Sequence, residues 1–424
     1  MNLTKEQQEI LEGKKGEVER KLMETLVRYG ELFGADSMVP ITGDYNHLVT
    51  SFGLKALTAV YDLLQQIIDD KESSKQKFTV DPRPLDPNVP TTFLQRIVFN
   101  HFMYSKQEDY EKQLKELGLK NDNAFTCTCY MDEVGNVPSK GDILSWSESS
   151  AVVYANSVLG ARCNRNSGII DIMGSLLGLV PHFGFLTDDG RKASWIIEVK
   201  TTKKPEAQLL GSAIGMKVME DVPYVVGLDK WLGNELNDQA KDYLKDFGAA
   251  TASNGAVGLY HIDNLTPEAV ESGRDLILPE AKTYVIDDAE LERVYNDYPV
   301  IWKNKDAKPK LCFIGCPHLS YEQLMGWTKR IHTALKKNGR KKVVIPTVLT
   351  AAPDVIERFE QTKGASVLKM HGVVLSYICP LMYMNNPLST KMPVITSSNK
   401  LRTYTSARYY TDKEILSQIT GGQI

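Results

Sequence analysis

Apolar positions recur with helical spacing through the first third of the chain. One stripe lies on a single face of EVERKLMETLVRYGELFG and consists of Leu22, Leu26, Tyr29 and Leu32. A second stripe, after SFG, consists of Leu54, Leu57, Val60, Leu63, Leu64 and Ile67. The four prolines of KFTVDPRPLDPNVPTT predict an extended loop, and a polar helix is expected over 106–118. The first third is therefore predicted to be mainly helical.

Short apolar runs alternate with helical patterns in the rest of the chain. Strand-like runs WIIEV, YVVGL and GAVGLYHI fall between 195 and 300, and later ones are LCFIG (311–315), KVVIPT (342–347), GVVLSYI (372–378) and PVITSS (393–398). The helix over SYEQLMGWTKRIHTALKK has the capping signal of Ser320 followed by Gln323, and APDVIERFEQ predicts another helix. This alternation predicts an α/β fold with mostly parallel sheets flanked by helices.

Composition narrows the class of protein. A length of 424 residues suggests two or three lobes, and a net charge of −3 shows no basic excess that would indicate a nucleic-acid partner. No apolar run is long enough for a membrane span, and the charged start has no signal-peptide core. The six scattered cysteines suggest a reducing compartment. We therefore expect a cytoplasmic protein.

Three cysteines are candidate metal ligands because of where they fall. Cys316 in GCPH and Cys379 in YICP are expected just past the carboxyl ends of strands, and Cys127 lies in a loop. Thiolates bind soft metals and iron–sulfur clusters, and a cluster on three cysteines leaves one iron open as a Lewis acid. Their separations match no compact motif, so three small buried apolar side chains are the alternative.

The other cysteines have more ordinary interpretations. Cys312 lies in the middle of a predicted strand and is expected in the core. Cys163, between Arg162 and Arg165, has either a lowered pKa or a packing role. Cys129 stands one residue beyond Cys127, in FTCTCY.

Two polar stretches are candidate anion sites. ESSAVVYANSVLGARCNR combines serines, asparagines and arginines with small residues, which is typical of a carboxylate or phosphate cradle or of a closely packed helix. TSSNK (396–400) offers hydroxyls and a cation at a strand end, as an anion site or as a solvated turn. No GxGxxG, P-loop or GxSxG element is present.

Several ordered motifs together resemble the large, catalytic subunit of the aconitase X family. They are LTKEQQEILEGKKG, LVRYGELFGAD, TCTCYMDEVGNVPSKGDILSWSESSAVVYANSVLGARCNR, GAATASNGAVGLYHI, FIGCPHLSYEQL, YICP and ITSSNK, and they extend over nearly the whole chain. The resemblance implies an aconitase-like α/β catalytic domain over 1–424, in two or three lobes around a central cleft. We expect a helical lobe over 1–120, a middle α/β lobe over 121–305 and a C-terminal α/β lobe over 306–424.

The resemblance also implies the chemistry. It places an iron–sulfur cluster, 4Fe–4S or 2Fe–2S, on Cys127, Cys316 and Cys379. The implied activity is that of a hydro-lyase, or dehydratase, acting on a small hydroxy acid. Our first choice of substrate is cis-3-hydroxy-L-proline and our second is (R)-5-phosphomevalonate. The small swivel domain of the family is absent from this chain, so a separate small subunit is implied, which would supply a serine as the catalytic base.

The lining of the implied site departs from the family pattern. GDYNHLVTSFG, FTVDPRPLDPN, CNRNSGIIDI and TSSNKLRTYT all differ from the usual segments, and Cys129 replaces a proline. The candidate substrate-binding residues are His47, Ser149, Ser150, Asn156, Arg162, Asn164, Arg165, Ser398 and Lys400. A non-catalytic iron–sulfur redox or iron-sensing protein is the rival class, favoured if Cys129 is a fourth ligand.

Overall fold

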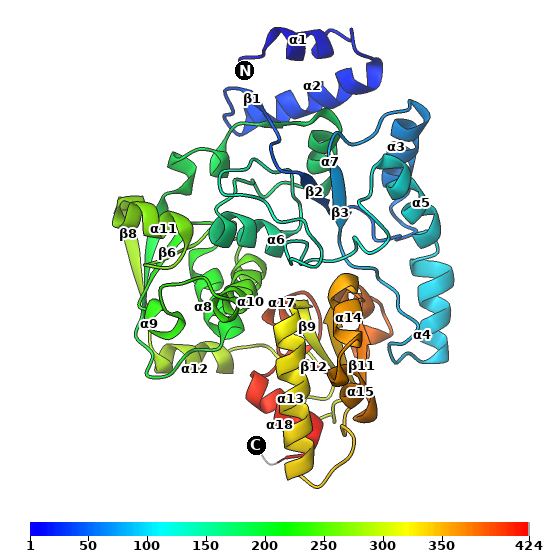
Figure 1. Ribbon diagram of the computed structural model, residues 1–424, viewed down its shortest axis with the longest axis vertical. Coiled ribbons are helices and arrows are strands. Elements are labelled where there is room, and N and C mark those ends of the chain that lie inside the picture. Colours follow the sequence, from blue (N-terminus) through cyan, green and yellow to red (C-terminus); the bar gives the residue numbers. More distant parts are fainter. Residues whose placement is uncertain (423–424) are drawn as a thin grey trace.

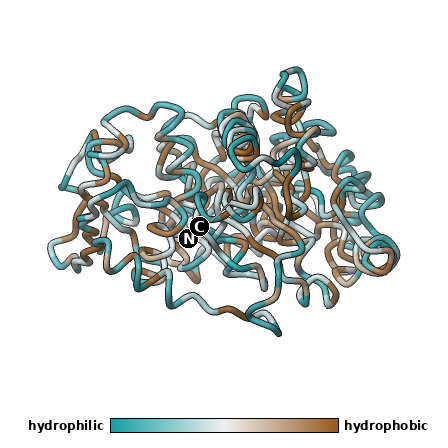
Figure 2. The backbone as a smooth tube through the Cα atoms, turned by 90° about the horizontal axis from the view of Figure 1, so that it is seen from below, coloured by the Kyte–Doolittle hydropathy of each residue, from teal (hydrophilic) through white to brown (hydrophobic). Residues whose placement is uncertain are grey.

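The computed structural model describes residues 1–422 and has a mixed α/β architecture (Figure 1). Within these residues no helix is both long and apolar enough to cross a membrane. Hydrophilic residues follow much of the outer loops and helices (Figure 2). Residues 1–422 form four sheets, and three of these contain only parallel strands. The prediction of an α/β fold with mostly parallel sheets is confirmed.

Most helices of the N-terminal part pack around one hydrophobic core, whereas Phe99 packs in a core of the C-terminal part. The elements of the N-terminal part are α1 Lys5–Leu11, α2 Glu17–Leu32, β1 Met38–Pro40, β2 Tyr45–Leu48, α3 Thr58–Asp69, β3 Lys77–Val80, α4 Phe93–Ile97, the π-helical η1 Val98–Met103 and α5 Gln107–Leu117. Leu22 and Leu26 of the α2 stripe and Leu64 and Ile67 of the α3 stripe enter the N-terminal core, whereas Leu32 at the end of the α2 stripe is exposed. The core also takes in Phe125. Part of the segment predicted as an extended loop is instead strand β3, which pairs in parallel with β2. Residues 121–145 form no helix and no named strand.

The middle part contains a parallel sheet of order β7-β6-β5-β8. Its elements are α6 Ser149–Tyr154, the π-helical η2 Ala155–Leu159, α7 Gly168–Leu177, β4 Leu179–Pro181, η3 Gly184–Leu186, η4 Asp189–Arg191, β5 Ala193–Val199, α8 Ala207–Val218, β6 Pro223–Val226, α9 Asp229–Leu232, α10 Asp238–Asn254, β7 His261–Ile262, α11 Pro267–Ser272, η5 Gly273–Leu276, β8 Ile277–Ile286 and α12 Asp288–Asn296. Strand β4 pairs antiparallel with β1. Helix α10 packs against α8 and α6 and against α17 (Asn399–Tyr404), so it links the middle part to the C-terminal part.

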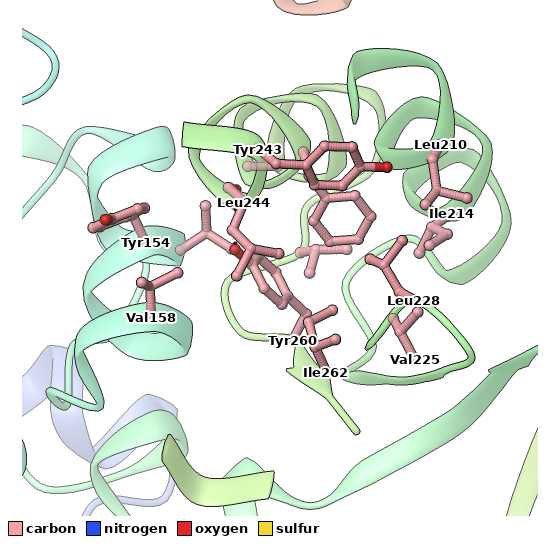
Figure 3. Close-up of a cluster of buried hydrophobic side chains, with 14 of the residues drawn as sticks. Tyr154, Val158, Leu210, Ile214, Val225, Leu228, Tyr243, Leu244, Tyr260 and Ile262 are labelled. Carbon is pink, nitrogen blue, oxygen red and sulfur yellow. Dashed lines mark hydrogen bonds between the residues drawn. The ribbon is translucent and has the colours of Figure 1, made fainter. Parts of the chain in front are cut away.

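Figure 3 shows the largest hydrophobic core, where aromatic and aliphatic side chains of the middle part pack together. Tyr260 lies edge-on to Phe247 on α10, with ring centroids 4.9 Å apart. The hydroxyl of Tyr260 donates to the carbonyl oxygen of Leu244 (3.0 Å), so the buried phenol is satisfied. This core fixes the place of α6, which carries the polar stretch of the candidate site.

The C-terminal part contains a five-stranded parallel sheet of order β11-β10-β9-β12-β13. Its elements are β9 Leu311–Leu319, α13 Tyr321–Lys337, β10 Thr347–Ala351, α14 Pro353–Glu360, α15 Lys363–Met370, β11 Val373–Ser376, α16 Pro380–Met384, η6 Ser389–Lys391, β12 Val394–Thr396, α17 Asn399–Tyr404, β13 Arg408–Tyr409 and α18 Asp412–Thr420. Side chains of β9 alternate between two hydrophobic cores, one on each face of the sheet. The predicted cap of α13 is confirmed, because Ser320 and Gln323 form a capping box.

Candidate active site

A bulge in β9 presents the first candidate ligand. Ile314 pairs with Leu349 of β10, but the next pairing joins Leu319 to Ala351, so the residues between leave the regular register. Gly315 begins this bulge at φ +108°, and a Cβ there would lie 2.4 Å from the carbonyl oxygen of Thr350. Cys316 was predicted to follow the strand, and this is wrong in detail, because β9 continues to Leu319. The bulge nevertheless takes Cys316 out of the regular ladder.

The three candidate cysteines are buried and interact electrostatically. Burial raises the pKa of Cys127 well above its ordinary range, and the nearby charge of Cys316 raises it further. Burial likewise raises the pKa of Cys379, again with a contribution from Cys316, and it raises the pKa of Cys316 to about 11. Lys400 lowers the pKa of all three thiols. The three thiols thus share one buried region with the Lys400 ammonium, and the buried Lys245 also lowers the pKa of Cys316.

None of the six cysteines forms a disulfide in the described part of the chain. Over residues 1–422, no three His, Cys, Asp or Glu side chains converge closely enough to hold a single metal ion. A mononuclear site would need such convergence, whereas the cysteines of an iron–sulfur cluster can each bind a different iron.

His318 connects the segments that carry the three cysteines. Its backbone N–H donates to the Cys127 Sγ (3.4 Å), and its ring Nδ1 lies 3.0 Å from the Thr126 Oγ1. Its Nε2 lies 3.2 Å from the carbonyl oxygen of Ile378, the residue before Cys379. Burial lowers the pKa of His318 to about 4. The fully buried, neutral imidazole of His318 therefore bridges the segment that carries Cys127 and the segment that carries Cys379.

A buried ion pair lies beside the thiols. Lys400, on α17, contacts the Glu148 carboxylate and lies 3.2 Å from the Ser150 Oγ, which itself donates to Glu148 (2.7 Å). Burial alone would raise the pKa of Glu148, but the charge of Lys400 dominates and lowers it to about 2. Ser398 caps α17 by accepting from the Leu401 N–H (3.1 Å), and its hydroxyl also donates to the Cys316 carbonyl. The TSSNK segment is therefore a buried helix cap rather than a solvated turn.

Asp81 is a site residue that the sequence reasoning did not single out. It directly follows β3, and its Oδ1 lies 3.6 Å from the Nε2 of His47, which is buried on β2. Both of these atoms lack a hydrogen-bond partner in the described residues. Burial raises the pKa of Asp81 well above its ordinary range, and the charge of Glu148 adds to the effect. Its place just past a parallel strand was the available signal.

The charge of Glu148 also acts on Arg165. Its side chain is half-buried, and neither a hydrogen bond nor an ion pair engages its guanidinium among the described residues. Burial lowers its pKa, and the charges of Tyr404 and Glu148 oppose the shift. Ser149 lies at the start of α6, next to Glu148. Arg165 is thus a cation without a fixed protein partner at the edge of the site.

Three of the predicted substrate-binding residues lie together in a different setting. The amide of Asn156 bonds the backbone of Cys163 and Gly258, and that of Asn164 bonds the backbone of Phe183 and Phe185. Arg162 pairs with the exposed Asp188 and donates to the Leu186 carbonyl (2.8 Å). These side chains hold the loops around η3 and η4.

The remaining cysteines lie in the hydrophobic interior. Cys163 is fully buried, and burial raises its pKa well above the ordinary range, so the idea of an acidified thiol is wrong and packing explains it. Cys312 is a residue of β9 and lies in a hydrophobic core, as predicted. Cys129 belongs to the large middle core together with Tyr130 and Trp146.

Comparison with known proteins yields family models, relatives and a solved structure that agree with one another. The family model for the aconitase X first domain matches residues 1–189, and that for the second domain matches residues 193–296. The phosphomevalonate dehydratase large subunit of Thermococcus kodakarensis is 31% identical over 83% of this chain and 81% of its own. The cis-3-hydroxy-L-proline dehydratase of Hypocrea jecorina is 29% identical over 68% of this chain and 48% of its own. The crystal structure of aconitase X from Thermococcus kodakaraensis in its holo-form superposes with a TM-score of 0.80 at 27% identity, covering 99% of this chain and 100% of that one.

The fold and these relatives define the class as a hydro-lyase, an enzyme that breaks a carbon–oxygen bond by dehydration. The chain belongs to the aconitase X family. The resemblance read from its motifs is thereby confirmed.

Proposed function

We propose that this chain is the cytoplasmic large subunit of an iron–sulfur-dependent dehydratase acting on a small hydroxy acid. The observation that carries the proposal is the presence of three buried, unbridged thiols, from Cys127, Cys316 and Cys379, in one region with the Lys400 ammonium. The proposal divides the chain as the sequence suggested, into lobes over 1–120, 121–305 and 306–424.

The donor set fits an iron–sulfur cluster. Thiolates are the usual ligands of such clusters, and these thiols are sheltered from water. The high pKa values of Cys127 and Cys379 mean that neutral thiols are favoured without a metal. Bound iron ions would favour the thiolates, as metal ions do at coordinating sulfur atoms. The cluster would be 4Fe–4S or 2Fe–2S.

A cluster with three protein ligands would supply an open iron as a Lewis acid for the hydroxyl or carboxyl group of the substrate. In the proposal Arg165 binds the anionic group of the substrate, because its planar fork suits carboxylate or phosphate. Beside the reacting atoms, opposite charges are paired by Lys400 and Glu148, with Ser150 in contact with both. The same region is lined by Asp81 and His47. The base that takes the proton from carbon is assigned to a serine of a separate small subunit.

The other predicted substrate residues receive different roles in this proposal. Ser149 and Ser398 stay near the substrate through their neighbours Glu148 and Cys316. Asn156, Arg162 and Asn164 support the site by holding the adjoining loops, because their polar groups are engaged within the chain. Cys129 lies in the hydrophobic core, which supports three ligands rather than four and argues against the electron-transfer alternative.

The choice of substrate changes with the comparisons. We now propose a 5-phosphomevalonate-type hydroxy acid first and cis-3-hydroxy-L-proline second. The match to the phosphomevalonate dehydratase large subunit covers most of both chains, whereas less than half of the hydroxyproline dehydratase is covered. The name of the former also implies a separate small subunit.

Anaerobic reconstitution with iron and sulfide tests the proposal. We expect the wild-type chain to take up iron and develop visible absorption, and each of Cys127→Ser, Cys316→Ser and Cys379→Ser to lower the iron content sharply. Cys163→Ser is the matched control, since this buried cysteine lies elsewhere, and Cys129→Ala should also keep its iron. Unchanged iron in all three ligand variants would reject the cluster.

The substrate is decided by assay of the reconstituted chain co-expressed with a small subunit. Each candidate hydroxy acid is supplied in turn, and formation of the dehydrated product is measured. We expect turnover of one substrate with both subunits present and none with the large subunit alone. A chain that holds a cluster but dehydrates neither substrate would favour the sensor class.

A further inference from the structure

The segments that carry the three cysteines are joined by a single side chain, and that side chain is not one of the ligands. Cys127 belongs to the loop that follows the N-terminal core, Cys316 to the bulge of β9 and Cys379 to the turn after β11. Figure 1 shows that these elements come from separate regions of the chain. Since β9 and β11 belong to one sheet, it is the position of the Cys127 loop relative to that sheet that depends on contacts made between the segments.

His318 makes these contacts from a fully buried position. Because the Ile378 carbonyl can only accept, the Nε2 must carry the proton and donate to it (3.2 Å). The Nδ1 is then an acceptor and takes the proton of the Thr126 hydroxyl (3.0 Å). Thr126 Oγ1 in turn accepts from the backbone N–H of Thr128 (3.1 Å). Every donor in this chain of hydrogen bonds meets an acceptor, so the ring orientation is determined.

The backbone of His318 adds two further contacts. Its N–H donates to the Cys127 Sγ (3.4 Å), and its carbonyl accepts from the Lys245 Nζ of α10 (3.1 Å). An N–H···S bond favours the thiolate form and is one of the factors that set the reduction potential of a cluster. The carbonyl contact ties the bulge of β9 to the middle part.

We propose that His318 is a positioning residue that clamps the three cysteine segments together and so sets how firmly the chain holds its cluster. This inference rests on the proposed function. Partners outside the ligand shell commonly change metal affinity by about 10–100-fold when they are removed. We expect an effect of that order on iron retention.

Three substitutions separate the contacts of the ring. His318→Gln can place an amide N–H near the Nε2 position and keep the bond to Ile378, while His318→Asn can keep an acceptor near Nδ1 for Thr126. Thr126→Val removes the hydroxyl at nearly constant volume and leaves the histidine in place. His182→Gln is the control, because that histidine is half-exposed beside Asp36, away from the cysteines.

The measurement is the rate at which a chelator removes iron from the reconstituted, anaerobic chain. We expect each of the three variants to lose iron about tenfold faster than the wild type or more, and the control to match the wild type. Far-ultraviolet circular dichroism of the apo-proteins should coincide, so that a folding defect is recognised. Wild-type rates of iron loss in both His318→Gln and Thr126→Val would overturn the clamp.

Titration of the apo-protein with Cd²⁺, followed by thiolate-to-metal absorption, distinguishes the clamp from the proposed function. If the wild type binds Cd²⁺ through its thiols and the variants bind it more weakly, the clamp is supported even where iron uptake fails and the proposed function is rejected. If neither metal is bound by the wild type, both are overturned. If iron is bound and Cd²⁺ affinity and iron loss are the same in all variants, only the clamp is overturned.

Discussion

Single residues around the thiols are arranged so that charge is balanced without water. Glu148 is ionised because Lys400 contacts it, and this negative charge together with burial favours a neutral Asp81. The Lys400 ammonium thus acts on the carboxylate of Glu148, on the neutral carboxyl group of Asp81 and on the three thiols. Arg165 is a further cation nearby, and no protein carboxylate among the described residues neutralises it.

Substitution of Arg165 should affect substrate binding more than turnover. Arg165→Gln removes the charge, and we expect KM to rise by about tenfold or more, because a charge-assisted bond to an anion is lost. Arg165→Lys should be intermediate, since lysine keeps the charge and loses the planar fork. Steady-state kinetics of the complex with the small subunit measure this. Arg162→Gln is the matched control, because Arg162 already pairs with Asp188, and an equal rise in KM there would contradict the assignment.

Asp171 gives a pH dependence of stability that is independent of the active site. It is fully buried on α7, where Ser145 donates to its Oδ1 (2.9 Å), and burial raises its pKa to about 8. Between about pH 4 and 8 the unfolded chain has released this proton while the folded chain keeps it, so stability falls as pH rises. The loss is about 1.4 kcal/mol per pH unit and on the order of 5 kcal/mol over that window.

Asp171→Asn should remove this slope, because an amide resembles the neutral carboxyl group and has no proton to release. Urea unfolding at several pH values measures the difference between variant and wild type, which we expect to grow in favour of the variant from pH 5 to pH 8. Glu206 and Asp242 also have raised pKa values, but they contribute to both proteins and cancel in the difference. Parallel stability curves would show that Asp171 is ionised in the folded chain.

Whole elements were predicted well where periodicity was strong and less well where the strands bend. The helices α2 and α3 and the capping box of α13 follow from local physics and are present, although Leu32 at the end of the predicted α2 stripe is exposed. KVVIPT was expected to be a strand, but β10 begins only at Thr347, the residue after Pro346. Proline has no N–H for a ladder, which explains why pairing starts after it. The bulge in β9 depends on a tertiary pairing with β10 and has no local pattern.

The pair of Lys400 and Glu148 connects α17 to α6, and its removal should show at the level of these elements. Lys400→Met leaves Glu148 buried without its counter-charge, and we expect a loss of about 3–5 kcal/mol near pH 7. The loss should shrink at low pH, because Glu148 can then take up a proton. In the wild type the pair contributes stability above the ordinary pKa of a glutamate and loses it as pH falls towards about 2.

Urea unfolding of both single variants and of the double variant measures the coupling. Lys400→Met with Glu148→Gln should regain much of the stability lost in Lys400→Met alone, because no unpaired charge stays buried. Lys192→Met provides the control, since its pair with the exposed Asp189 is screened by solvent and contributes little to stability. Additive effects at positions 148 and 400 would mean that the pair contributes no coupling.

At the scale of the whole molecule the candidate site is assembled from parts distant in sequence. The sequence identified Cys127, Cys316 and Cys379 through the family resemblance, because no spacing rule connects residues so far apart. It did not single out Asp81 or the clamp at His318, because both acquire their roles only when β2, β9 and α10 come together. The sequence does not distinguish an asparagine that binds a substrate from one that holds a loop by hydrogen bonds, as Asn156 and Asn164 do.

This assembly predicts that cluster loading stabilises the whole molecule. A group that binds only when three cysteine segments are correctly placed has affinity for the folded chain and little for the unfolded one, so binding shifts the equilibrium towards the folded state. We expect reconstitution to raise the Tm by on the order of 5 °C in anaerobic calorimetry. Oxidative loss of iron should reverse the shift, and Cys316→Ser should show none. A Tm that does not change on loading, in a chain shown to contain iron and sulfide, would mean that the cluster is held at a site that does not require the folded arrangement of the three segments.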